Sequence, residues 1–145
     1  MQGFPLHIFL YSSHTNNKNF GDEMRKIQIF LIGSLGYGLI EILWRGFTHP
    51  TMLLAGGICF LAITEIANYF TGFSDLKKSI LSSFFITAVE MIIGVIVNIG
   101  LNLKVWDYSG LPFNILGQVS LIYSFFWLIL SFIIFKILKK IKKYA

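Results

Sequence analysis

Four long apolar runs constrain this chain more than any other feature of its sequence. Each contains about 18 to 25 residues, which at about 1.5 Å per helical residue matches a hydrocarbon core of roughly 30 Å. In lipid, backbone amides must be satisfied within the segment, and the runs are continuous rather than alternating, so each is predicted to be a helix and not a barrel strand. The runs cover residues 27–44, 51–70, 79–103 and 115–138.

The composition does not fit a soluble domain. Hydrophobic residues make up 55% of the 145 residues and charged residues only 13%, whereas soluble domains are about one-quarter charged. A soluble surface would lack the charges it needs. We therefore predict an all-α, polytopic integral membrane protein. Residues 24–145 are expected to form one transmembrane domain, a four-helix bundle with a basic tail at 139–145.

Residues 1–23 do not belong to this pattern. The apolar stretch Phe4–Tyr11 is too short to span a membrane, and the polar stretch 12–20 is predicted to be a loop. No basic segment leads into an apolar core and a cleavage site, so a signal peptide is not expected. Met24, followed by two basic residues, resembles a natural start. Residues 1–23 are thus interpreted as an N-terminal extension that is disordered or not native.

The basic residues predict the orientation of the helices. Nine Lys and Arg residues lie before the first run, between the second and third runs, and at the C-terminal end of the chain. The two opposite loops, after the first and the third runs, carry only Arg45 and Lys104. We therefore expect a multi-pass protein of the cell membrane with both termini in the cytoplasm. The net charge of +5 is interpreted as membrane topology and lipid contact, with no nucleic-acid partner. The nine residues are Arg25, Lys26, Lys77, Lys78, Lys136, Lys139, Lys140, Lys142 and Lys143.

Three carboxylates lie inside the apolar runs, where an unpaired charge costs at least about 2 kcal/mol. They are Glu41, Glu65 and Glu90. Glu41 and Arg45 are four residues apart on one helical face, so they are predicted to pair and anchor the helix. Alternatively, Arg45 reads an anionic group that enters from outside, with Glu41 holding it in place.

Polar residues also lie within the third run and at the start of the fourth. Glu90 and Asn98 share a thin polar face, while Asn114 and Gln118 step by four at the start of the fourth run. Asn114 is predicted to be the N-cap of that helix. In the fourth run small residues and Trp127 recur on one face, which favours a packing seam over a ligand-lining face. That face comprises Gly117, Ser120, Ser124, Trp127 and Ser131.

The outer loop between these runs has its own signals. Trp106 and Tyr108 fit an aromatic belt at the membrane interface, and Asp107 fits an Asx turn with Ser109. Because most of these polar groups share the outer half of the membrane, we predict a polar pocket that opens to the outside. The candidate residues are Glu41, Arg45, Glu90, Asn98, Trp106, Asp107, Tyr108, Asn114 and Gln118, with Glu65 and His49 secondary.

No cofactor or metal is expected. His49 has no second histidine at a ligand spacing within the predicted domain and is interpreted as a loop residue, while Cys59 is interpreted as a packing residue. The chain has no serine–histidine–aspartate set and no HExxH motif, so an enzyme is the weakest hypothesis.

The outer loop resembles a known family of membrane proteins. The run Val105–Ser109, followed by Pro112–Asn114, Gly117–Gln118 and Trp127, resembles the signature of the CmpB-type, ABC-transporter type IV family. The animal transmembrane protein 229 family is similar in the same stretch. Glu90, sixteen residues before Trp106, resembles the third-helix glutamate of that family.

The resemblance implies a transport-related protein, and two functions stay open. The first is binding of a small solute in the outer pocket, with a homo-oligomer or another membrane subunit as partner, since four helices are few for a transporter. No Walker motif is present, so the chain has no ATPase of its own. The second is a structural or interaction protein whose buried polar residues only specify helix packing.

Overall fold

The structure is a computed structural model that describes residues 6–144, with side chains described for residues 18–142. Four helices are long and apolar enough to cross a membrane. They are α1 (Leu6–Arg45), α2 (Pro50–Tyr69), α3 (Asp75–Gly94) and α4 (Leu121–Tyr144). The predicted fold class, an all-α membrane protein with four spanning helices, is confirmed.

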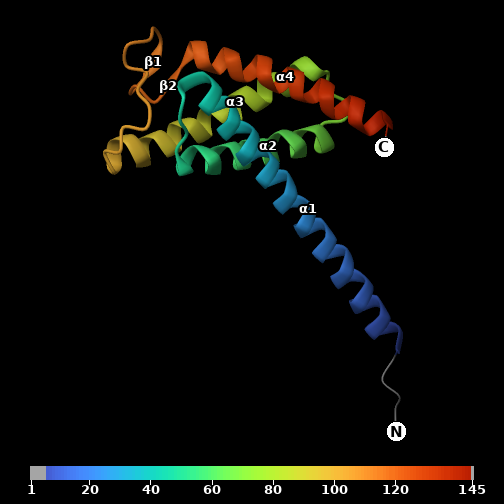
Figure 1. The fold of residues 1–145 in the computed structure, drawn as a ribbon. Coiled ribbons are helices and arrows are strands. Elements are labelled where there is room, and N and C mark those ends of the chain that lie inside the picture. The colour runs from blue at the N-terminus through green and yellow to red at the C-terminus, as the bar shows by residue number, and fades with distance from the viewer. Residues whose placement is uncertain (1–5, 145) are drawn as a thin grey trace.

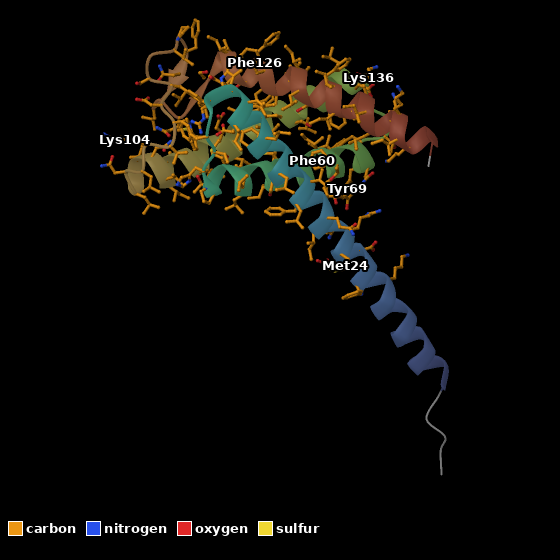
Figure 2. All side chains as sticks on the ribbon, viewed as in Figure 1. Met24, Phe60, Tyr69, Lys104, Phe126 and Lys136 are labelled. Carbon is orange, nitrogen blue, oxygen red and sulfur yellow. The ribbon has the colours of Figure 1, made fainter. Side chains whose placement is uncertain are left out.

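The four helices form an up-and-down bundle. Helix α1 packs on α2, α2 on α3, and α3 on α4. The first part of α1, the α2–α3 turn and the end of α4 lie toward one end of the bundle, whereas the α1–α2 turn and the α3–α4 connection lie at the other (Figure 1). Short connections between long helices make sequential neighbours antiparallel. Lys104 and Lys136 accordingly lie at opposite ends of the bundle (Figure 2).

Residues 6–23 are helical, which corrects the loop predicted over residues 12–20. Residues 1–5 of the predicted extension lie outside the described residues, and the interpretation of residues 1–23 as disordered or not native stays a prediction. Helix α1 runs without interruption from Leu6, and its first half, including Met24, projects away from the other helices (Figures 1 and 2). The helix contains no proline, the residue least compatible with a helix interior, although residues 12–21 are rich in Ser, Thr, Asn and Gly, which are weak helix formers. Whether native translation begins at Met24 stays a prediction.

The fourth helix begins at Leu121, six residues later than predicted. The intervening residues form a small antiparallel hairpin, in which β1 (Asn114–Ile115) pairs with β2 (Val119–Ser120). Asn114 is therefore not the N-cap of this helix. Instead, the Ser120 hydroxyl accepts the backbone N–H of Tyr123 at 3.3 Å, which satisfies one of the unpaired amides of the first turn.

The third span ends in a wider helix. Helix α3 continues directly into the π-helix η1 (Val95–Gly100), in which Leu101 N–H bonds to the carbonyl of Ile96. The span thus ends near Gly100 rather than at residue 103. Single turns of π-helix are rare and are frequent at functional sites. Here the wider turn buries Asn98 beneath the α3–α4 connection, residues 101–120, which we call the outer connection after its predicted side of the membrane.

Close backbone approach holds α1 against α2. A Cβ atom at Gly33 would lie 2.7 Å from the carbonyl oxygen of Gly56, so only glycine fits there. Small residues let helices approach in lipid, where packing replaces the hydrophobic effect as the cause of association. Two buried apolar clusters complete the core. They are Met52, Val97, Val105 and Trp106 in one, and Ile63, Ile86 and Phe135 in the other.

Candidate functional site: a cavity beside Glu90

Glu90 lies on α3 with only 6% of its surface exposed. Its Oε1 accepts the hydroxyl of Tyr108 at 2.9 Å, and its Oε2 accepts the indole N–H of Trp127 at 3.1 Å. These donors come from the outer connection and from α4. Among residues 18–142, no Lys, Arg or His side chain lies within 4 Å of this carboxylate. Glu90 is therefore stabilised by two neutral donors and by no basic group in the described chain.

Glu41 on α1 has a different environment. It pairs with Arg45, as the four-residue spacing predicts, and it accepts the hydroxyl of Tyr37 at 3.3 Å. The guanidinium also donates to the carbonyl of Val105 at 2.9 Å and lies over the ring of Phe47. The predicted ion pair is thus confirmed, and it ties α1 to the outer connection.

Asn98 and Gln118 form the centre of a second polar network. Asn98 donates to the Gln118 side chain at 2.8 Å and accepts the backbone N–H of Val105 at 2.7 Å. The Gln118 carbonyl accepts the indole N–H of Trp106 at 2.9 Å. Trp106 is buried, so it is a core residue and not the interfacial belt residue predicted. Each polar atom of this network finds its partner inside the protein, which is how buried polar groups are normally tolerated.

The rest of the outer connection is held by its own turns. Asp107 accepts the backbone N–H of Ser109 at 2.8 Å, which confirms the Asx turn. This hydrogen bond lowers the pKa of the Asp107 carboxyl. Asn114 donates to the carbonyl of Leu111 at 2.8 Å and accepts from Gly117 at 3.1 Å. Gly117 has φ +68°, which a β-carbon would disfavour.

Tyr108 connects this loop to the buried carboxylate. Its ring stacks on Tyr123 with centroids 4.3 Å apart, while its hydroxyl reaches Glu90. Burial raises the pKa of Tyr108, and the negative charge of Glu90 raises it further. Tyr108 therefore remains protonated and serves as a hydrogen-bond donor.

A cavity of about 260 Å³ lies against Glu90, between all four helices. Its wall is almost entirely apolar, and the lining residues with a side-chain oxygen or nitrogen are Tyr37, Glu90, Trp106 and Trp127. The other lining residues are Ile32, Gly33, Gly36, Ile40, Met52, Ala55, Gly56, Cys59, Phe60, Ile63, Ile86, Val89, Ile93, Leu130 and Ile134.

This cavity is not lined by the set of residues predicted for a polar pocket. Of the nine candidate residues, only Glu90 and Trp106 line it. The other candidates bond to one another or to the outer connection, because that connection folds back over the bundle and supplies their partners. The residues outside the cavity are Glu41, Arg45, Asn98, Asp107, Tyr108, Asn114 and Gln118.

The secondary candidates also lie outside the cavity. The His49 ring accepts the backbone N–H of Thr51 at 3.3 Å and caps α2. Glu65 on α2 is half-buried. The predicted seam of small residues on α4 is a contact with α3, where Ser83 donates to the carbonyl of Ser124 at 2.5 Å. Gly117 and Ser120 precede the helix and are not part of that face.

Two lining residues with polar side-chain atoms, Tyr37 and Trp127, were not among the predicted site residues. Tyr37 lines the cavity and bonds to Glu41, and Trp127 binds Glu90, although Trp127 was assigned only to the packing seam. A signal for Tyr37 is present in the sequence, because it precedes Glu41 by four residues, as Glu41 precedes Arg45. Only the tertiary structure brings Trp127 to Glu90.

The fold and this site define a multi-pass membrane protein with a buried carboxylate beside an apolar cavity. A family model described as "Putative ABC-transporter type IV" matches residues 37–145. The chain therefore belongs to this CmpB-type family, and the match includes Glu41, Glu90 and the whole outer connection. No curated protein and no solved structure matches the chain.

Proposed function

We propose that this protein binds a small molecule inside the membrane, in the cavity beside Glu90, as part of a transport process. One observation carries the proposal: a buried carboxylate with no basic partner in the described chain lines an internal cavity. Acidic groups inside membrane spans are costly and typically mark binding sites, ion pathways or proton relays. Membership of a transporter-type family favours the same function.

The proposed role is binding rather than catalysis. The described cavity wall contains one thiol, Cys59, and one carboxylate, Glu90, but the Glu90 oxygens bond to Tyr108 and Trp127, and no hydrogen bond joins the thiol to a base in the described chain. Four spans are few for an independent transporter, so we propose a homo-oligomer or another membrane subunit as partner. Crosslinking in native membranes, followed by mass measurement of the adducts, tests this. A chain that stays monomeric and uncrosslinked would contradict it.

Tryptophan fluorescence offers a direct test of the cavity. The chain has three tryptophans, and Trp44→Phe removes the one that is exposed on α1. Trp106 and Trp127 then remain, and both line the cavity. In nanodiscs of this variant, we expect bromobenzene to quench the fluorescence saturably as it fills the cavity.

A cavity-filling variant provides the control. Ala55 lines the cavity from α2, so Ala55→Leu in the Trp44→Phe background should abolish the saturable component. Equal, non-saturating quenching in both variants would reflect probe dissolved in lipid alone. That result would contradict the proposed function.

A structural role is the second candidate function, and a specific observation favours it. Asn98, Gln118 and Trp106 satisfy one another and pin the outer connection to α3. If Glu90→Gln stabilises the protein and the unsubstituted cavity shows no saturable bromobenzene binding, the polar residues serve packing, because unpaired buried charge is costly.

We further propose that the protein lies in the cell membrane with both chain ends in the cytoplasm. The support is the excess of Lys and Arg at that end of the bundle. Single cysteines placed at Leu76 and at Phe113, in a Cys59→Ala background, should differ in labelling by a membrane-impermeant maleimide. Labelling of Leu76→Cys from outside intact cells would overturn this orientation.

A further inference from the structure

The charges around the cavity do not balance. Within the described residues, the group at the outer half of the bundle contains two buried carboxylates, Glu41 and Glu90, and one guanidinium, Arg45. Arg45 is engaged by Glu41 and by the carbonyl of Val105. One carboxylate thus remains without a basic partner among the described residues, and it belongs to Glu90, which lines the cavity.

Aromatic rings surround the space next to that carboxylate. Tyr37, Trp106 and Trp127 all line the cavity, and the rings of Tyr37 and Trp127 lie 5.8 Å apart at an interplanar angle of 51°. The faces of such rings attract cations, most strongly in tryptophan and where water is excluded. A carboxylate among aromatic rings therefore favours a positively charged organic group.

The rest of the cavity determines the remainder of the ligand. Its wall is aliphatic, so a strongly hydrated ion would lose its water shell without replacement ligands. The cavity extends to the exposed face of α1, where Ile32 is 59% and Ile40 is 44% exposed. That face belongs to a helix long and apolar enough to cross a membrane, so we expect it to lie within the bilayer. A ligand arriving there has to be compatible with a membrane.

From these three observations we infer that the cavity binds a hydrophobic organic cation whose charged group pairs with Glu90 and packs against the rings of Tyr37, Trp106 and Trp127. The inference rests on the proposed function and specifies its ligand class. The aliphatic wall formed by residues such as Ile63 and Ile134 accommodates the apolar part of the ligand.

A pair of isosteric probes tests the charge directly. Benzyltrimethylammonium and neopentylbenzene have the same shape, but only the first is charged, and its charge does not depend on pH. Each competes with bromobenzene for quenching of Trp106 and Trp127 in the Trp44→Phe protein, in nanodiscs of zwitterionic lipid. We expect the cation to displace bromobenzene at a concentration at least roughly tenfold lower than the neutral isostere, because the charge interaction is available only to the cation.

Two glutamate variants assign the effect to Glu90. Glu90→Gln should remove the preference for the cation while neopentylbenzene still competes. Glu65→Gln is the matched control, since it removes a carboxylate of α2 that does not line the cavity, and it should leave the preference unchanged. Elution as a single species in gel filtration, together with retained bromobenzene quenching, shows that each variant is folded.

The outcomes separate the two proposals. If bromobenzene binds saturably but both isosteres compete equally in the wild-type cavity, the cation inference is overturned and the binding function stands. An unchanged cation preference in Glu90→Gln would also overturn the inference. If bromobenzene does not bind saturably at all, both the proposed function and the cation inference are overturned. Should Glu90→Gln not fold, Tyr37→Leu replaces it, and a cation preference that stays intact would contradict the aromatic contribution.

Discussion

Trp127 on α4 donates its indole N–H to the Oε2 atom of Glu90 on α3 at 3.1 Å, and both residues line the same cavity. This hydrogen bond joins the two helices at the site that carries the proposed function. It therefore links the stability of the bundle to the integrity of the cavity, and it gives the first prediction.

Replacing Trp127 by phenylalanine should destabilise the protein. The substitution keeps an aromatic ring but leaves one oxygen of Glu90 without its donor, which costs about 1–3 kcal/mol for a buried polar group. Thermal unfolding in detergent measures the effect. Trp44→Phe is the control. Because Trp44 is exposed on the surface of α1, its replacement should shift the unfolding midpoint little. Equal midpoints for the two variants would show that the bond contributes nothing to stability.

Asn98 and Gln118 should show strong energetic coupling. Asn98→Ala leaves the Gln118 side-chain oxygen and the Val105 amide without a partner, at a cost of about 1–3 kcal/mol. Gln118→Ala removes part of the same network. The double variant should therefore lose less unfolding free energy than the two single variants lose together. A double-mutant cycle of unfolding free energies measures the coupling, expected at about 0.5–3 kcal/mol. Strict additivity would mean that the network is not formed.

Two glycines of α1 should respond differently to the same substitution. A β-carbon at Gly33 meets the backbone of Gly56, so Gly33→Ala should separate α1 from α2 and destabilise the protein by roughly 1–3 kcal/mol. A β-carbon at Gly36 meets nothing within 4 Å. Gly36→Ala should therefore be neutral or stabilise the helix by up to about 1 kcal/mol. Thermal unfolding of both variants checks the difference, and a stable Gly33→Ala protein would contradict the close helix contact.

The turn at Asp107 should loosen at acidic pH. Because the backbone N–H of Ser109 lowers the pKa of the folded carboxyl below its usual value, its contribution is fully present above that usual value. The contribution is lost as the pH falls through the lowered pKa. Hydrogen exchange at the Ser109 amide, corrected for the intrinsic pH dependence, should accelerate in that acidic range. Asp107→Asn keeps an acceptor that does not titrate, so its corrected exchange should stay constant with pH.

Much of the fold follows from local composition. The runs 51–70 and 79–103 correspond to α2 and to α3 with η1, because an unbroken apolar stretch of this length is stable in lipid only as a helix. The pairing of Glu41 with Arg45 was also predictable, since both residues lie on one helix at a fixed spacing. The Asx turn at Asp107 depends on two neighbouring residues and was predictable for the same reason.

The helix boundaries that were predicted wrongly depend on contacts between residues that are distant in the sequence. Residues 115–120 are apolar enough to extend the fourth helix, yet they form a hairpin because Asn98 and Trp106 bind Gln118 and draw this segment over the end of α3. No local propensity contains that information. The same contacts explain why Asn114 and Gln118, four residues apart, do not share a helical face.

The sequence by itself determined that this protein spans the membrane four times and that Glu90 is an unusual residue, because hydrophobic length and the cost of a charge in lipid are local properties. Only the tertiary structure decided what surrounds Glu90. The outer connection folds back and satisfies Asn98, Gln118 and Arg45, whereas residues from four helices leave an apolar cavity beside the carboxylate. Hydrogen-bond partners and cavities arise from segments far apart in the chain, which is why the sequence alone did not predict an apolar cavity beside the Glu90 carboxyl.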